Sequence, residues 1–374
     1  MRVGIVTLHR VFNYGSVLQA YATQRVIEKM GYQPFIVDYI MPHTKNFEIW
    51  KQRPPEIQGV LRTGVYHTAK LASIMLKKKT FGGFIKKHLV LTDKKYVGYS
   101  ALLKNPPFAD AFITGSDQVW NSYYNRGIDH AMFLKFTPKS CPRIAYASSF
   151  GKDTLDRTEI QETKELIQQY RSISVRENTA ISILNSLGYK NGTWLIDPTL
   201  QISSREWSRL AAKPLVKDKY LVLMLLYNED NQATEFARAT ADKLGLKLVK
   251  LSWELHCPKG VDRLFTHRGP EDFLSMFMNA DYVVTNSFHG LAFSINFNCP
   301  FIVVPRKEFN SRIASLLELT GLQERLVNTK DAALAVTDDE IDYNQVNAIL
   351  ENERKRTECF LSEALQAKTD FSKG

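Results

Sequence analysis

The stretch that decides the fold is residues 2–40, RVGIVTLHRVFNYGSVLQAYATQRVIEKMGYQPFIVDYI. Its opening RVGIVTL is a short apolar run rich in β-branched residues, which predicts a buried strand. A polar loop with Asn13 and Gly15 follows, and apolar residues then recur at helical spacing as far as Ile27. Gly31 ends this predicted helix, and QPFIVDYI has the pattern of a second strand. The stretch therefore predicts a β-α-β unit.

The alternation of strand-like and helical segments continues along the chain, breaks over residues 201–219, and resumes at KYLVLMLLY. A chain of 374 residues is long enough for two domains. We therefore expect an α/β protein with two Rossmann-like domains that face a cleft, residues 1–205 and 206–374, the first with a basic helical insert at 41–105. Ligands of such folds bind near the carboxyl ends of the strands.

The composition, 44% hydrophobic and 24% charged, is typical of globular proteins. Residues 41–105 hold thirteen Lys or Arg against three Asp or Glu, and this excess equals the net charge of +10 of the whole chain. Such an insert suits an anionic lipid surface, a diphosphate-linked acceptor, or a pair of solvated helices without a partner. Nucleic-acid binding is not expected, because few aromatic residues are interleaved with the charges and no known motif is present.

The sequence begins with a strand-like run rather than the apolar core of a signal peptide, and no apolar stretch approaches the roughly 18 residues of a membrane span. We expect a cytoplasmic protein, with peripheral contact at the inner membrane face through residues 41–105. The four cysteines form no C-x-x-C pair, so neither a structural metal nor a disulfide framework is expected.

The first candidate for a binding loop is FNYGSVLQAYA. Asn13, Tyr14, Gly15 and Ser16 lie between strand and helix, and Gln19 lies one turn further. Gly15 allows close approach of a ligand to the backbone, and the free N–H groups of the following helix favour an anion. The alternative is an ordinary helix N-cap formed by Asn13 or Ser16.

The second candidate is FITGSDQVWN, where Ser116 and Asp117 follow a buried strand. These side chains can bind sugar hydroxyls, accept a proton, or cap a helix. Trp120 offers a stacking face for a sugar, or alternatively packs in the core.

The third candidate is VVTNSFHGLAFS, with Ser287, His289 and Gly290 at the end of an apolar strand. A histidine at this place faces the predicted cleft and suits general acid or base work, whereas a structural histidine is the alternative. Gly290 allows a substrate to come close.

Three arginines are candidates for binding a phosphate or carboxylate, because a guanidinium pairs with such groups through two hydrogen bonds. Arg176 sits at a predicted strand end in SISVREN, and its alternative is an ion pair with Glu177 or a neighbouring acid. Arg268 and Arg312 are the others, and each has a surface or capping role as its alternative.

The segments NYGSVLQAYA, GSDQVWN, SVREN, IDPTL and TNSFHGLAFSINFNCPFIV, in this order, resemble the signatures of polysaccharide pyruvyl transferases over nearly the whole chain. The resemblance implies an architecture similar to the glycosyltransferase B fold. It also implies phosphoenolpyruvate as donor, no cofactor, and a sugar or lipid-linked oligosaccharide as acceptor, with a pyruvate ketal as product. His289 matches the active-site histidine of the family, and Arg176 matches an arginine near the donor.

The chain departs from the family at one position, since many relatives carry Arg-Leu-His-Gly where it has Ser287-Phe288-His289-Gly290. Either Arg268, Arg312 or a lysine takes the place of the missing arginine, or the donor differs. Two other functions remain open at this point. One is a nucleotide-sugar glycosyltransferase, and the other is a non-catalytic protein that binds carbohydrate or a membrane surface.

Overall fold

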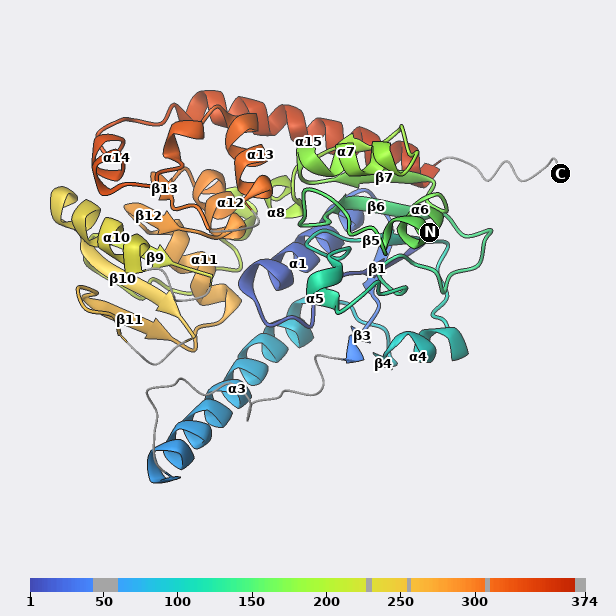
Figure 1. The fold of residues 1–374 in the computed structure, drawn as a ribbon, viewed down its shortest axis with the longest axis horizontal. Helices are drawn as coiled ribbons and strands as arrows, with labels where there is room; N and C mark the ends of the chain where they lie inside the picture. The colour runs from blue at the N-terminus through green and yellow to red at the C-terminus, as the bar shows by residue number, and fades with distance from the viewer. Residues whose placement is uncertain (43–59, 227–230, 254–256, 307–309, 367–374) are drawn as a thin grey trace.

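A computed structural model describes residues 1–42, 60–226, 231–253, 257–306 and 310–366. Two parallel β-sheets, each packed with helices, lie side by side and form two α/β domains (Figure 1). The predicted fold class is confirmed.

The first sheet contains six strands in the order β2-β1-β5-β6-β7-β8, and every neighbouring pair is parallel. Their bounds are β1 (Arg2–Val6), β2 (Gln33–Ile36), β5 (Ala111–Thr114), β6 (Arg143–Ser148), β7 (Ser172–Val175) and β8 (Thr193–Trp194). This is the flavodoxin-like strand order with one strand added, and its switch point lies between β1 and β5. The β-α-β unit predicted for residues 2–40 is confirmed as β1, α1 (Tyr14–Lys29) and β2.

The second sheet has the order β11-β10-β9-β12-β13, again entirely parallel. Its strands are β9 (Tyr220–Met224), β10 (Lys247–Ser252), β11 (Arg263–Thr266), β12 (Tyr282–Thr285) and β13 (Phe301–Val303). Numbered within the domain, this is the Rossmann order 3-2-1-4-5, and its switch point lies between β9 and β12.

The helices connect and cover these strands. In the first domain they are α3 (Val60–His88), α4 (Tyr99–Lys104), α5 (Ser122–Asn125), α6 (Ile160–Ile167), α7 (Asn178–Ser186), α8 (Pro198–Gln201) and α9 (Ser204–Trp207). In the second they are α10 (Asn231–Leu244), α11 (Pro270–Met278), α12 (Phe288–Asn296), α13 (Ser311–Thr320), the 3₁₀ helix η2 (Gln323–Arg325), α14 (Lys330–Ala335) and α15 (Tyr343–Gln366). A short parallel pair, β3 (Tyr39–Ile40) with β4 (Tyr96–Val97), lies beside the first sheet. None of the helices in the described ranges combines the length and apolarity that crossing a membrane requires.

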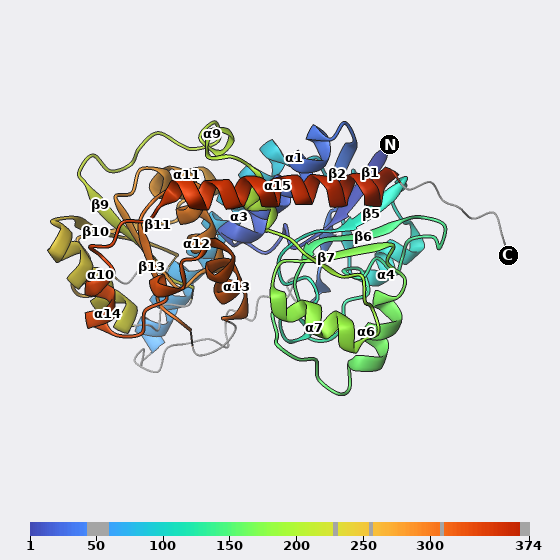
Figure 2. The same ribbon diagram turned by 90° about the horizontal axis from the view of Figure 1, so that it is seen from above.

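The last helix, α15, runs lengthwise over both domains and so brings the chain back to the first domain (Figure 2). The Nε of Arg354 donates to the carbonyl oxygen of Leu200 at 2.9 Å, and the Nε2 of Gln201 donates to that of Arg354 at 3.0 Å. The predicted boundary between residues 205 and 206 falls inside α9, between the two sheets, and stays a prediction.

Buried aromatic residues pack between the two domains and in the core of the first domain. Trp207 is fully buried, and its ring lies 5.6 Å from that of Tyr21 and 5.2 Å from that of Phe293. Trp120 is also buried, stacks on Phe133 at 5.4 Å, and donates its indole N–H to the carbonyl of Met132. The suggestion that Trp120 offers a stacking face to a sugar is therefore wrong, and the core-packing alternative holds.

Candidate functional site

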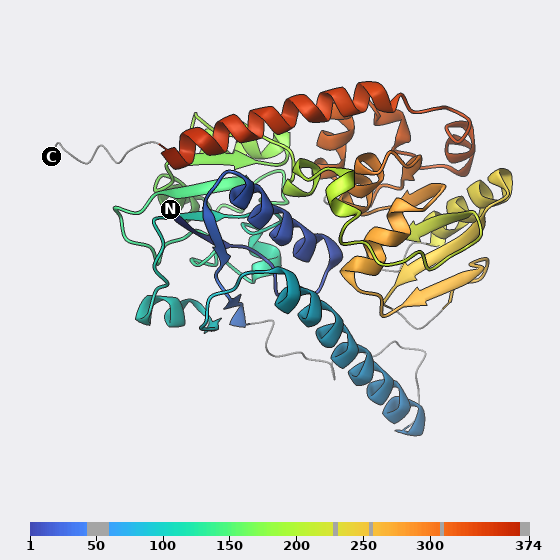
Figure 3. The same ribbon diagram turned by 180° about the vertical axis from the view of Figure 1, so that it is seen from behind.

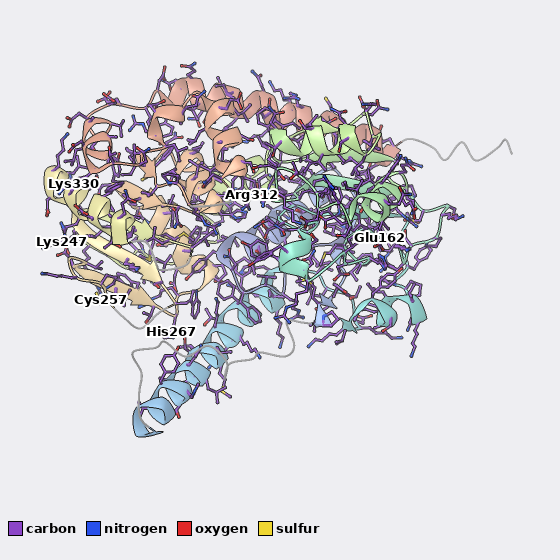
Figure 4. The ribbon with its side chains drawn as sticks, in the orientation of Figure 1. Glu162, Lys247, Cys257, His267, Arg312 and Lys330 are labelled. Atoms are coloured by element: carbon purple, nitrogen blue, oxygen red, sulfur yellow. The ribbon has the colours of Figure 1, made fainter. Side chains whose placement is uncertain are left out.

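A cavity of about 270 Å³ lies where the strand ends of the two sheets face each other. The first domain contributes Leu8, Val11, Asn13, Ser16, Met41, Asp117, Gln118, Tyr124 and Asn125 to its wall, and the second contributes Leu226, Ser287, Phe288, His289, Arg306 and Arg312. Figure 4 labels Arg312 in the region where the two domains meet. The loops after β1 and β5 meet those after β9 and β12 here, so the switch points of both sheets share one cavity.

The N-terminus of α1 forms one wall. Asn13 is its N-cap, because its Oδ1 accepts the backbone N–H of Gly15 at 2.9 Å, so the capping alternative is confirmed. Asn13 and Ser16 nevertheless line the cavity. Gln19 lies behind the wall, where its Nε2 donates to Thr7 Oγ1 and to the carbonyl of Ser16, both at 2.8 Å.

Tyr14 and Arg268 are brought together, but away from the cavity wall. The Tyr14 ring stacks on Phe273 at 4.8 Å, and its hydroxyl donates to the backbone carbonyl of Arg268 at 2.9 Å. The guanidinium of Arg268 lies over the ring of Phe265, 5.3 Å from the ring centroid. Both residues thus belong to the contact between the domains.

The second domain presents His289 in the first turn of α12, directly against the first domain. Ser287 is the N-cap of this helix, and its Oγ accepts the N–H of Gly290 at 3.3 Å. A Cβ atom added to Gly15 would lie only 1.9 Å from Nδ1 of His289. The absence of a side chain at residue 15 is therefore what allows the imidazole to pack against α1.

Gly290 is required by packing within its own domain. A Cβ atom at this position would lie 2.3 Å from Oγ1 of Thr285, the last residue of β12. That hydroxyl donates to the carbonyl of Met224 at 2.7 Å and accepts the N–H of Ser287 at 3.1 Å. The absence of a side chain at Gly290 lets α12 begin immediately after the end of β12. That Gly290 also allows a substrate to come close stays a prediction.

A fully buried arginine joins three strand ends behind the cavity. Arg176 follows β7 and donates to Oδ1 of Asp117 at 3.0 Å and to Oδ2 of Asp197 at 2.9 Å. Its guanidinium lies 4.7 Å from the ring centroid of Phe288 in the second domain. The sequence left open an ion pair of Arg176 with Glu177 or with a neighbouring acid, and the structure shows ion pairs with Asp117 and Asp197. The carboxylate of Glu177 instead accepts a hydrogen bond from Ser149 Oγ at 2.9 Å.

Asp117 lies between this arginine and the cavity. Its backbone φ is +76°, a left-handed conformation that is uncommon outside glycine. Its Oδ2 accepts a short hydrogen bond of 2.5 Å from Ser16 Oγ. Burial alone would raise the pKa of Asp117, but the charges of Arg176 and His289 and the Ser16 hydrogen bond outweigh it and hold the pKa below its usual value. Asp117 is therefore a carboxylate at neutral pH.

Asp197 is a site residue that sequence reasoning missed. Its Oδ2 accepts from Ser116 Oγ at 2.7 Å and lies 3.8 Å from Nε2 of His289, while its Oδ1 accepts the backbone N–H of Thr199 at 2.9 Å. Burial would raise the pKa of Asp197, but His289, Arg176 and the Thr199 N–H together lower it far below its usual value.

The signal for Asp197 was present in the sequence. Asp-Pro in IDPTL follows a strand-like run, and Asp197 caps α8 with Pro198 in its first turn. Because a capping role explains this pattern completely, nothing in it pointed to His289, which lies in the other domain.

Arg312, in the first turn of α13, is a buried cation in the cavity wall. Its Nε has no hydrogen-bond partner among the described residues. Burial, with the like charge of Arg176, lowers the pKa of Arg312 to about 10. An anion placed beside it would relieve both effects. Arg306 also lines the cavity, although it was not among the candidates from the sequence. It lies shortly after β13, and the other candidates were likewise chosen because they follow strand ends.

Within the described parts of the chain, no group of three or more His, Cys, Asp or Glu side chains is placed to hold a metal ion. The polar groups that line the cavity are the hydroxyl, carboxamide, carboxylate, imidazole and guanidinium groups described above. Such a set suits a ligand that carries both hydroxyl groups and negative charge.

A sequence profile of the family "polysaccharide pyruvyl transferase" matches residues 13–308. The chain belongs to this family. The matched region contains Asp117, Arg176, Asp197 and His289, whereas Arg312 lies just beyond its end. This family consists of transferases, so membership is consistent with the protein being an enzyme.

Solved structures with the same architecture are enzymes of the glycosyltransferase B fold. A protein assigned as a UDP-N-acetylglucosamine 2-epimerase from Listeria monocytogenes has a TM-score of 0.53 at 12% identity, over 97% of this chain and 96% of its own. A trehalose-6-phosphate synthase has a TM-score of 0.52 at 10% identity, over 98% and 99%. The UDP-GlcNAc 2-epimerase of Methanocaldococcus jannaschii, in complex with UDP-GlcNAc and UDP, has a TM-score of 0.50 at 14% identity, over 94% and 99%. At such identities these likenesses concern the fold alone, and no curated protein matches in sequence.

Replacing Gly15 by alanine tests the contact between α1 and His289. We expect Gly15→Ala to lower the free energy of unfolding by about 1–3 kcal/mol, because the new methyl group overlaps the imidazole. Urea denaturation followed by circular dichroism measures the change. Gly83→Ala in α3 is the matched control, since its Cβ would meet nothing within 4 Å and should be neutral or stabilising by up to about 1 kcal/mol. Equal effects of the two changes would contradict the contact.

Replacing Asp197 by asparagine tests the buried ion pair. We expect Asp197→Asn to lower the free energy of unfolding at pH 7 by about 3–5 kcal/mol, because Arg176 loses a charged partner while it stays buried. The pKa of Asp197 is lowered in the folded state, so its stabilisation is complete above the unfolded pKa of about 3.9 and is lost below it. The difference in the free energy of unfolding between wild type and Asp197→Asn should therefore become smaller as the pH falls below about 5.

Urea unfolding of both proteins between neutral and acidic pH measures this narrowing. Asp242→Asn is the matched control, because Asp242 pairs with Arg238 at the surface with its side chain 67% exposed, and its loss should cost less than about 1 kcal/mol. A difference for Asp197→Asn that stays constant across the pH range would refute the assigned pKa direction.

Proposed function

We propose that the protein transfers the pyruvyl group of phosphoenolpyruvate to two hydroxyl groups of a sugar, forming a pyruvate ketal in polysaccharide biosynthesis. Family membership supports the reaction class. The observation that carries the proposal is the placement of His289 beside Asp197, at a cavity that also contains Arg306 and Arg312. The acceptor is a free sugar or a lipid-linked oligosaccharide, and the reaction needs no cofactor. We place it in the cytoplasm, where its donor is a metabolite.

His289 is the general acid of the proposed reaction. Its imidazolium gives a proton to the methylene carbon of phosphoenolpyruvate, and the carbon that bears the phosphate becomes electron-poor. The carboxylate of Asp197 lies 3.8 Å from Nε2 of His289. A sugar hydroxyl then attacks the electron-poor carbon and gives its proton to the imidazole, which restores the acid. The second hydroxyl attacks the same carbon, the bond from that carbon to the phosphate oxygen breaks, and inorganic phosphate leaves with the second proton as the ketal closes.

Two aspartates orient the groups around this histidine in the proposal. One carboxylate oxygen of Asp117 accepts from Ser16 and the other accepts from Arg176. In the proposal these bonds hold Asp117 in place in the cavity wall, and a sugar hydroxyl of the acceptor points toward this wall. Arg176 pairs with Asp117 and Asp197 through its two terminal nitrogens, and its proposed part is to position these two carboxylates. Ser116 acts in the same way on Asp197.

Arg312 is the proposed binding group for the charged end of the donor. Ser287 stands where many relatives carry arginine, so the negative charge of phosphoenolpyruvate needs another cation. Of the two arginines among the candidates from the sequence, Arg312 lines the cavity and Arg268 does not. Arg306 supplies a second positive charge on the same wall.

Release of inorganic phosphate from phosphoenolpyruvate, assayed with a panel of free and lipid-linked sugars, tests the reaction. We expect acceptor-dependent release, and His289→Ala should lower kcat by about 10²–10⁴-fold because the general acid is lost. His130→Ala is the matched control, since this histidine pairs with Glu162 away from the cavity and should leave kcat unchanged. No release with any acceptor, together with binding of a nucleotide sugar by calorimetry, would favour a glycosyltransferase instead.

A pair of arginine variants tests how the donor is held. Arg312→Gln should raise the KM for phosphoenolpyruvate about 10–100-fold, because a hydrogen bond to a charged group contributes about 1.5–3 kcal/mol. Arg268→Gln removes the same charge outside the cavity wall and should change KM less than about threefold. Steady-state phosphate release at saturating acceptor gives both values. A larger effect of Arg268→Gln than of Arg312→Gln would overturn the assignment.

A further inference from the structure

Helix α3 projects from the body of the protein as an arm (Figures 1 and 3). The end of the helix nearest His88 is anchored by Phe81, Phe84 and Ile85, which are buried in the core between the domains. The residues before them, 64–80, make up the arm. Their outer end lies away from both sheets in the two views.

One face of the arm is occupied by the second domain. Ser73 Oγ and His267 Nε2 are hydrogen-bonded at 2.9 Å, and Lys77 Nζ lies 5.2 Å from the ring centroid of Trp253. Figure 4 labels His267 beside the arm. These contacts fix which side of the helix is turned away from the protein.

The other face carries exposed apolar side chains. Val65 is 71% exposed and Met75 is 60% exposed, with Leu76 at 43% and Leu71 at 39%. Ala72 follows Val65 by seven residues, and Met75 and Leu76 follow Ala72 by three and four, so the four side chains share one helical stripe. Single exposed apolar residues are ordinary, but a stripe on a projecting helix indicates a surface that becomes covered.

The charge of the helix is of one sign. From Gly64 to His88 the sequence contains six lysines and no aspartate or glutamate: Lys70, Lys77, Lys78, Lys79, Lys86 and Lys87. Four of them, Lys78, Lys79, Lys86 and Lys87, are exposed. Lys79 lies four residues after Met75 and three after Leu76, so it continues the exposed face that carries the apolar stripe. A helix face that exposes apolar and basic side chains together suits the interface of an anionic membrane.

We propose that the exposed face of α3 docks on an anionic lipid surface. The apolar stripe enters the boundary between headgroups and acyl chains, and the lysines neutralise lipid phosphates. A second copy of the chain fits this face less well, because it would bring the exposed Lys78 and Lys79 of the two copies near one another. Nucleic acid would pair with the lysines and leave the apolar stripe exposed to water.

The arm begins next to the candidate site. Phe81 at its base lies 6.0 Å, between ring centroids, from Phe12, and Phe12 stands between the cavity-lining residues Val11 and Asn13. Docking would therefore hold the cavity near the membrane, where a lipid-linked acceptor is found. The docking itself does not depend on the proposed reaction.

Co-sedimentation of the whole protein with vesicles tests the proposal. One set of vesicles is phosphatidylcholine alone, and the other contains phosphatidylcholine and phosphatidylglycerol in equal amounts. We expect partitioning to the second set only, and a loss of about tenfold or more when Lys78 and Lys79 are both changed to Glu, because each lysine is attracted to the anionic surface. Raised salt should weaken binding as well, since it screens these charges.

Two further variants separate charge from apolar contact. Lys139→Glu combined with Lys355→Glu changes two exposed lysines elsewhere, and should leave vesicle binding within about twofold of wild type if attraction is local to the arm. Met75→Gln combined with Leu76→Gln keeps every charge and the helix propensity, and should also weaken binding. Circular dichroism checks that the variants stay folded.

Three results would overturn the proposal. They are equal binding to both vesicle sets, equal loss in the arm and control lysine variants, and absence of vesicle binding together with self-association that Met75→Gln and Leu76→Gln abolish. The last would assign the face to a second copy of the chain. Because these vesicles contain neither donor nor acceptor, failure here leaves the phosphate-release assay unaffected.

Discussion

The interaction on which the site depends is the buried pairing of Arg176 with Asp117 and Asp197. These residues follow β7, β5 and β8, so one guanidinium fixes the ends of three strands. A buried charge destabilises a protein unless partners and hydrogen bonds satisfy it, and here Ser16, Ser116 and Thr199 bond the carboxylates. His289 of the second domain lies 3.8 Å from Asp197, so the pairing reaches across the contact between the domains.

The same contact makes the site a property of both domains together. Asp197 caps α8 in the first domain, and His289 stands in the first turn of α12 in the second. They meet because Gly15 has no side chain to keep the imidazole away from α1. Trp207, buried against Tyr21 of the first domain and Phe293 of the second, and α15, which runs over both domains, hold the domains in this arrangement. Under the proposed reaction, a change in the domain contact would move the acid relative to the hydroxyl-binding wall.

Sequence periodicity predicted the two parallel sheets and the loops that form the cavity, because strand ends in a doubly wound sheet converge wherever the helices pack. It could not predict the direction in which neighbouring side chains point. Tyr14 and Ser16 are two residues apart, about 200° around the helix, so Ser16 faces the cavity and Tyr14 faces the second domain. Asp197 and His289 are 92 positions apart, and only the folded chain joins them. Arg268 was selected by charge alone, and its guanidinium lies over an aromatic ring.

Under the proposed reaction, the serine at position 287 changes how negative charge is held, because the family resemblance implies an arginine at this position in many relatives. Its Oγ accepts the N–H of Gly290 and caps α12, which an arginine side chain cannot do. The cap uses one of the free N–H groups that would otherwise attract an anion to this helix. The cations lie instead on the next strand connection, at Arg306 and Arg312, on the same wall of the cavity. Under the proposed reaction the donor's charged end therefore lies toward α13, and its methylene carbon is left to face His289.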